Sequence, residues 1–208
     1  MIFDISRRIS TSTPVWTGDT PYQTQSVLKM ADGASVNLTT ITTTLHIATH
    51  ADAYFHYTPG GIVMADMPLS PYLGRARVVT VSKTSGPLMV ADLPDIDYAG
   101  GERLLIHSQA SESPHETWWP NFVYPSPELI AHLAGLGYVL IGVDAPSFDA
   151  YDSHDLPGHN ALRKHDMVNL ENLYLHEIAD GDYELIALPL KLDAACGSPV
   201  RAILRSLD

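Results

Sequence analysis

The sequence contains little sulfur and little positive charge. Cys196 is the one cysteine among 208 residues, so neither an internal disulfide framework nor a zinc site of four cysteines can form. Because free cysteine is most often a small buried apolar residue, we expect that role for Cys196, with a nucleophile as the alternative. Lysine and arginine number 12 against 24 aspartates and glutamates, giving a net charge of −12. Nucleic-acid binders usually carry a basic face, so this balance argues against that class.

Long apolar runs are also missing. No run reaches the roughly 18 residues that span a bilayer. Residues 1–8 hold only a very short apolar patch, whereas a secretory signal needs an apolar stretch of roughly 7–15 residues. We therefore expect a cytoplasmic protein with no membrane partner. The hydrophobic fraction of 45% is enough for a true core, and a single domain over residues 1–208 is expected.

The remaining pattern is rich in β-structure. Ser126 and Pro127 precede an apolar stripe and predict a helix that ends at Gly135 and Gly137. A second helix is expected to start near Asn160. Together these features predict a single α/β domain with a β-rich mixed sheet and a few flanking helices. Runs that are β-branched, alternating or continuously apolar predict strands at 36–45, 76–82, 103–107, 138–143 and 183–192.

Side chains that bind metals are concentrated in one short segment. His46, His50, Asp52 and His56 share it, and imidazole and carboxylate are common ligands of zinc-like ions. His50 and Asp52 would point to the same side of an extended chain. The Cα atoms of His46 and His50 would then lie roughly 13 Å apart, which leaves almost no slack for a shared ion. We therefore expect the chain to curl near Ala48, with a helical turn or a loop of unrelated polar residues as alternatives.

Competing catalytic motifs are not found. The sequence has no Gly-x-Ser-x-Gly nucleophile elbow and no phosphate-binding Gly-x4-Gly-Lys-Ser/Thr. Gly135-Leu-Gly137 lacks the third glycine of a dinucleotide fingerprint and is better explained as a turn. Metal-assisted hydrolysis is therefore the function that the pattern favours.

The metal-binding segment also resembles a known family. His46-x-Ala-Thr-His50-x-Asp52-x-Tyr-x-His56 is similar to the His-x-Gly-Thr-His-x-Asp-x-Pro-x-His signature of the cyclase-type metal-dependent hydrolases, whose best-known members are the bacterial kynurenine formamidases, or arylformamidases. Two positions depart from it: Ala48 replaces glycine, which restricts φ, and Tyr54 replaces proline, which adds a large ring. Further similarity covers Trp16-Thr-Gly-Asp-Thr-Pro21, Ile141-Gly-Val-Asp-Ala-Pro-Ser-Phe-Asp149, His159 and Glu171.

This resemblance implies a swivelling β/β/α-like fold and a two-metal site. The first ion would be held by His46, His50 and Asp52. The second would take Asp52 as a bridging carboxylate together with His159 and Glu171. Such sharing suits two ions roughly 3.5–4 Å apart. Zinc is expected from the ligand set, two ions per subunit, with manganese as the alternative.

The resemblance further implies an activity. It is the hydrolysis of N-formyl-L-kynurenine to L-kynurenine and formate in tryptophan degradation, with His56 moving the proton and Trp16 packing on the aromatic ring. Trp16 in the core is the alternative for that residue. Hydrolysis of another amide, a lactone or an ester is the first alternative function, and a metal-binding protein without catalysis is the second. A homodimer is expected, and Trp118 and Trp119 could line the entrance, the core or the dimer contact.

Three other polar residues lie near these motifs in the sequence. Asp144 and Asp149 are expected either to orient ligands or to cap a turn. His154 is expected to be a solvated loop histidine.

Overall fold

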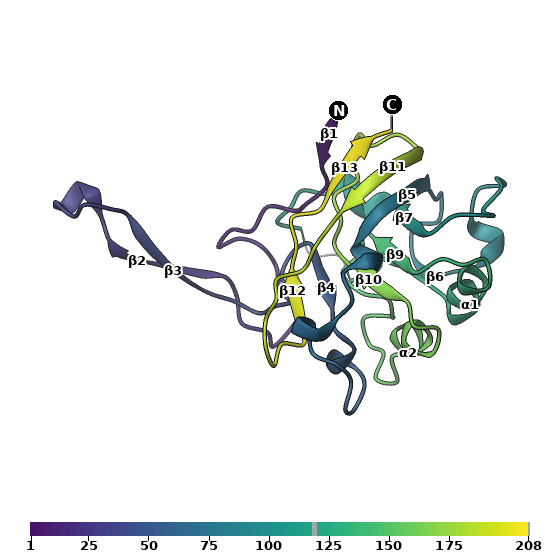
Figure 1. Ribbon diagram of the computed structural model, residues 1–208, viewed down its shortest axis with the longest axis horizontal. Helices are drawn as coiled ribbons and strands as arrows, with labels where there is room; N and C mark the ends of the chain where they lie inside the picture. The colour runs from purple at the N-terminus through teal and green to yellow at the C-terminus, as the bar shows by residue number, and fades with distance from the viewer. Residues whose placement is uncertain (118–119, 208) are drawn as a thin grey trace.

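A seven-stranded mixed sheet forms the centre of the computed structural model, which describes residues 1–117 and 120–207 (Figure 1). Four strands pair antiparallel at one side of the sheet, and the last of these is followed by three more strands that run parallel to it. The predicted mixed, β-rich α/β domain is therefore confirmed. In spatial order the strands are β1 (Ile2–Asp4), β13 (Ile203–Ser206), β11 (Gly181–Ile186), β5 (Leu73–Thr80), β7 (Arg103–His107), β9 (Leu140–Val143) and β10 (Val168–Leu170).

Two α-helices in the described residues connect the parallel strands. Helix α1 (Pro127–Gly135) lies in the chain between β8 (Val123–Pro125) and β9, and Ser126 caps it by accepting a hydrogen bond from the Leu129 amide at 3.1 Å. Helix α2 (Pro157–Lys164) joins β9 to β10 and begins before the predicted Asn160. The earlier start arises because the Asp149 side chain accepts hydrogen bonds from the first free amides of α2, a contact that local sequence does not reveal.

The core lies on both faces of the sheet. Residues Leu104–Ile106 of β7 and all of β9 are buried, as the apolar runs predicted. One apolar cluster includes Ala51, Leu170 and Leu204, and the other includes Leu129 of α1. The strand predicted over 183–192 ends at Ile186, shortly before Pro189, which has no amide to donate to a ladder.

Smaller elements surround this frame. Strand β4 (His50–Asp52) pairs antiparallel with β12 (Gly197–Pro199), and β6 (Gly86–Leu88) pairs parallel with β8 (Val123–Pro125). No helix among the described residues is long and apolar enough to cross a membrane. Short 3-10 helices span Met30–Asp32, Tyr54–His56, Met64–Asp66, Ser70–Tyr72, Val90–Asp92 and Gln109–Glu112.

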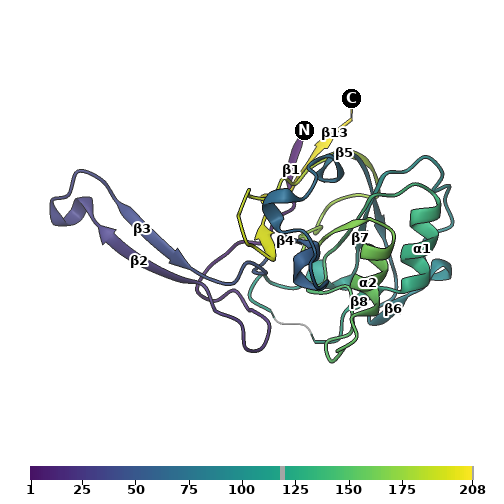
Figure 2. The ribbon, with the colours of Figure 1, turned by 60° about the horizontal axis from the view of Figure 1, so that its bottom comes forward.

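A two-stranded arm projects from the body of the molecule (Figures 1 and 2). It consists of β2 (Gln23–Leu28) and β3 (Leu38–Thr42), paired antiparallel with a bulge near Leu28. Every residue of both strands is exposed. The strand predicted over 36–45 is thus shorter than expected and belongs to this arm. Alternation of apolar and polar residues predicts a strand, but it does not predict what covers the apolar side chains.

Candidate metal centre

Three segments that are distant in the sequence meet at one end of the sheet. The turn before β4 carries His46, β4 carries His50 and Asp52, and the first turn of α2 carries His159. Glu171 follows β10 directly and forms a backbone bridge with His50: each amide donates to the other residue's carbonyl, at 3.2 and 3.0 Å. The structure therefore brings together all five side chains that the sequence analysis suggested as metal ligands.

The curl predicted near Ala48 is present. Ala48 has a φ of 50°, in the left-handed region where glycine is usual and a Cβ is strained. This conformation places the Ala48 carbonyl 2.8 Å from Nδ1 of His50, which donates to it. The hydrogen bond fixes the imidazole so that its Nε2 faces the two carboxylates.

Two ligand groups share one carboxylate. His46 Nδ1 and His50 Nε2 lie 2.8 and 3.5 Å from Oδ1 of Asp52. On the other side, His159 Nε2 lies 3.4 Å from Oδ2 of Asp52 and 3.3 Å from Oε1 of Glu171. Asp52 thus presents one oxygen to each group, and in each group the ligand atoms lie within 4.8 Å of one another.

The spacing of these atoms fits divalent cations better than direct hydrogen bonds. Tetrahedral coordination with bonds of about 2.0–2.1 Å separates neighbouring ligand atoms by about 3.3–3.4 Å. Four of the nitrogen–oxygen separations are 3.3–3.5 Å, longer than an ordinary hydrogen bond. Oδ1 of Asp52 is buried, and although Nδ1 of His46 lies 2.8 Å from it, the two do not have the geometry of a hydrogen bond, so the oxygen depends on a nearby positive charge.

The pKa shifts of the ligand side chains also indicate a cation-binding centre. Burial lowers the pKa of His46 and of His50, but the adjacent Asp52 carboxylate outweighs it and raises them to about 10 and about 9. Burial raises the pKa of Asp52, whereas His159 and His46 bring it well below its usual range. The metal-free centre therefore balances buried carboxylates with protonated imidazoles, and bound cations would take the place of those protons.

Two buried residues hold the ligands in place. Asp149 Oδ2 accepts a hydrogen bond of 2.6 Å from Nδ1 of His159, so it both orients a ligand and caps α2. Asn169 donates to Asp52 Oδ2 at 2.7 Å and to Glu171 Oε1 at 3.3 Å, and its own carbonyl accepts from the Asp52 amide. The sequence analysis missed Asn169. Its one available signal was its position two residues before Glu171, on the same side of an extended chain.

His56 lies at the open side of the centre. Its ring centroid is 4.0 Å from that of His46 and 6.2 Å from that of His159. His56 is exposed at the rim of the centre, but the side chains around its ring still desolvate it enough to lower its pKa, which favours the neutral imidazole. His56 is therefore placed beside both ligand groups, as a proton carrier requires.

A pocket of about 360 Å³ opens onto these residues. Trp16 and Tyr151 form an aromatic wall, with their ring centroids 4.9 Å apart. The sequence analysis did not single out Tyr151. His154 is exposed, as expected, and also lines this pocket. Trp118 and Trp119 lie outside the described residues.

Comparison with known proteins decides the family. The Cyclase family model, described as "Putative cyclase", matches residues 3–150. The chain belongs to the cyclase family. Relatives within it include the kynurenine formamidases of Bordetella pertussis and Bordetella bronchiseptica, each 41% identical over 206 residues, or 99% of this chain and 98% of the relative.

Solved structures share the fold of this cyclase-family chain. A "Potential Metal-Dependent Hydrolase With Cyclase Activity" aligns with a TM-score of 0.85 at 21% identity, covering 98% of this chain and 96% of that one. An isatin hydrolase bound to thioisatinate aligns with a TM-score of 0.82 at 21% identity, covering 98% and 91%. At this identity they establish the cyclase fold alone.

Of two other polar residues, Cys196 differs from what the sequence suggested, and Asp144 takes one of its two expected roles. Cys196 is only half-buried, and its Sγ lies 3.1 Å from Nε2 of His46, so the expectation of a buried apolar cysteine is wrong. The reason is the β4–β12 pairing, which carries residue 196 next to the ligand segment. Asp144 caps a turn and does not orient a ligand: its carboxylate accepts from the amides of Ser108 and Ser111 and from the Ser108 hydroxyl, at 2.7–3.0 Å.

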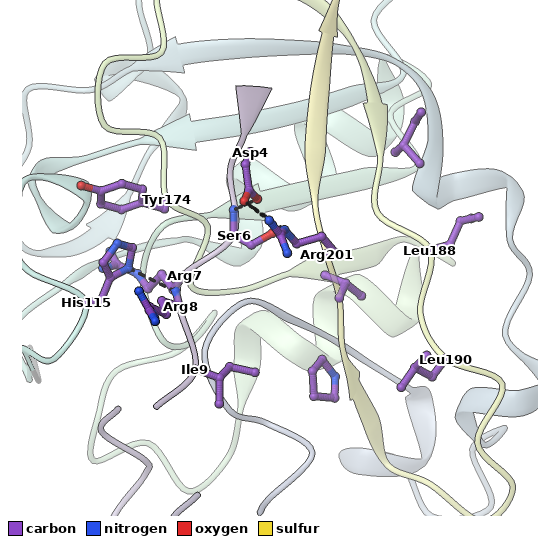
Figure 3. A pocket seen from close by; sticks show the side chains of 13 residues that line it. Asp4, Ser6, Arg7, Arg8, Ile9, His115, Tyr174, Leu188, Leu190 and Arg201 are labelled. Atoms are coloured by element: carbon purple, nitrogen blue, oxygen red, sulfur yellow. Dashed lines mark hydrogen bonds and ion pairs between the residues drawn. The ribbon is translucent and has the colours of Figure 1, made fainter. Parts of the chain in front are cut away.

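A wider concavity of about 930 Å³ lies beside β1 and β12 (Figure 3). Two of its charged groups pair with each other, since Arg201 donates to Asp4 at 2.6 Å, and the Arg7 guanidinium donates to the Ala110 carbonyl at 2.9 Å. The pocket that holds both metal-ligand groups is therefore the candidate active site of this cyclase-family protein.

Proposed function

We propose that this cyclase-family chain is an amide hydrolase that converts N-formyl-L-kynurenine to L-kynurenine and formate. The observation that carries the proposal is Asp52, which is shared by two histidine–carboxylate groups at the base of an aromatic-walled pocket. The 41% identity to two kynurenine formamidases over nearly the whole chain supports this choice of substrate.

The proposed cofactor is a pair of zinc ions per subunit, with manganese as the alternative. His46, His50 and Asp52 would hold one ion, and Asp52, His159 and Glu171 the other. When bound, such ions supply Lewis-acid polarisation of the formyl oxygen and make a water molecule easier to deprotonate.

His56 is the proposed proton carrier. As water adds to the formyl carbon, Nδ1 or Nε2 of His56 accepts its proton, and the imidazolium then protonates the departing aniline nitrogen. The C–O bond of formate forms and the formyl C–N bond breaks. The lowered pKa of His56 suits this role because the first step needs the neutral imidazole.

The pocket suits an aromatic amino acid. Trp16 and Tyr151 offer ring faces for the kynurenine ring. Asp19 and Asp152 also line the pocket and carry the charge that complements the substrate's ammonium group. These four residues are proposed as the substrate-binding set.

A homodimer is proposed, supported by the arm. Two-stranded hairpins are only marginally stable alone in water, yet six apolar residues of this arm are each 44–58% exposed. A second copy covering the arm would remove that surface from water. Ile41→Glu should therefore weaken the dimer in sedimentation velocity, and a monomeric wild-type protein would contradict this part of the proposal. The cytoplasmic location stays a prediction from the sequence.

The activity is tested with a metal-replete assay on N-formylkynurenine beside formanilide, lactones and simple esters. N-formylkynurenine should be the preferred substrate, exhaustive chelation should abolish turnover, and zinc or manganese should restore it. Elemental analysis should give two metals per chain, and one in Glu171→Ala. Full activity after chelation would exclude the metal mechanism, and preference for a lactone or an ester would exclude the substrate.

A further inference from the structure

The far edge of His46 carries a second set of metal-binding atoms. Nδ1 of His46 faces Asp52, but Nε2 faces the opposite way, toward Sγ of Cys196 at 3.1 Å. His56 stacks beside the same ring. One ligand atom from each of His46, His56 and Cys196 lies within 4.8 Å of the other two.

The position of the thiol is set by backbone pairing. Gly197 pairs with Asp52, and the Ala53 amide donates to the Cys196 carbonyl at 2.9 Å. Residue 197 has to be small, because a Cβ there would lie 2.8 Å from Cε1 of His46. The His46 ring therefore packs on the β12 backbone, and Cys196 is held at the edge of that ring.

This donor set differs in chemistry from the carboxylate-rich centre. A thiolate with two imidazoles favours soft cations, whereas the centre built on Asp52 and Glu171 presents mainly oxygen and nitrogen. Tetrahedral zinc separates a sulfur ligand from a nitrogen ligand by about 3.5 Å, from bonds of about 2.3 and 2.0–2.1 Å. The observed 3.1 Å between Cys196 and His46 needs only a small side-chain adjustment. His56 is exposed, so an ion can reach the set from solvent.

We propose that Cys196, His56 and Nε2 of His46 form an additional, inhibitory site for a soft divalent cation such as cadmium, or for zinc in excess. Coordination releases two protons, that of the Cys196 thiol and the one that a neutral His46 keeps on Nε2 while its Nδ1 serves the loaded centre, and it occupies the lone pair of His56. His56 can then no longer accept a proton from water, so hydrolysis stops while the carboxylate-rich centre stays loaded. Cation binding at this site does not require that the substrate be N-formylkynurenine.

The test is a cadmium titration of the zinc-loaded protein. Wild type should bind one extra cadmium per chain with the ultraviolet charge-transfer band of a thiolate–cadmium bond, and turnover should fall in parallel. Cys196→Ser keeps a hydroxyl beside His46 but removes the soft ligand. It should show no such band and should need at least about tenfold more cadmium for half-inhibition, relative to its own uninhibited rate. His176→Ala, at an exposed histidine that pairs with Glu112, is the matched control and should behave as wild type.

Two results would overturn the proposal. One is inhibition of equal potency in wild type and Cys196→Ser, which would mean that cadmium displaces zinc from the carboxylate-rich centre. The other is a wild-type titration without the thiolate band. Because the band and the cadmium stoichiometry need no substrate, they test this site even if the proposed formamidase activity fails.

Discussion

Replacing Asp149 by asparagine tests whether the ligands depend on their buried supports. The Asp149 carboxylate accepts three hydrogen bonds, from the amides of Gly158 and His159 and from Nδ1 of His159, at 2.6–3.1 Å. An asparagine amide presents one oxygen and one NH₂ group, so at least one of these donors loses its acceptor. Leaving a buried donor unpaired costs about 1–3 kcal/mol of folding stability.

The cost to metal binding should be specific. Removing a residue that orients a metal-binding histidine lowers metal affinity about 10–100-fold, which is about 1.4–2.8 kcal/mol of binding free energy. Because His159 belongs only to the group with Glu171, Asp149→Asn should weaken one of the two metals and leave the other in place. Chelator competition with elemental analysis measures this, and thermal unfolding of the metal-free protein measures the change in stability.

Asp144→Asn is the matched control. Asp144 is as buried as Asp149, each 2% exposed, and also accepts three hydrogen bonds, but from Ser108 and Ser111 and not from a ligand. Both variants should lose similar stability, and only Asp149→Asn should lose metal affinity. The reasoning is refuted if the two variants bind both metals equally well.

The other predictions concern proton transfer, pH and substrate recognition. His56→Ala should keep both metals and lose about 10²–10⁴-fold in kcat; metal loss instead would make His56 a ligand. In the chelated, folded protein the pKa values of His46 and His50 are raised to about 10 and about 9, whereas the pKa of histidine in the unfolded chain is about 6.5. The folding stability that these two histidines contribute is therefore fully present below about pH 6.5 and is lost as the pH rises through about 9–10. The gain in Tm on adding zinc should therefore grow over that range, and a constant gain would contradict the assignment. Joint replacement of Asp19 and Asp152 by asparagine should raise KM for N-formylkynurenine about fivefold, which is the size expected for the loss of an ion pair open to solvent. KM for formanilide, which carries no charge, should not change. Equal effects on both substrates would rule out recognition of the ammonium group.

Local patterns were reliable where the decisive contacts are local. The Ser126 cap and the apolar stripe predicted α1, and the apolar runs predicted β7 and β9 as strands buried on both faces. The curl at Ala48 followed from bond lengths and chain geometry alone. The start of α2 was placed too late because its capping residue, Asp149, lies well before it in the chain.

The sequence by itself determined which side chains could bind metals, and it favoured a curl of the chain near Ala48. Only the tertiary structure decided what lies next to them. The bridge between His50 and Glu171 and the Asn169 contacts join residues more than a hundred positions apart, and the β4–β12 pairing brings Cys196 to His46. These contacts depend on strand register and on the crossovers between parallel strands, which nearby residues do not specify. For that reason the sequence predicted the chemistry of the centre, and the fold decided its supports and its neighbouring thiol.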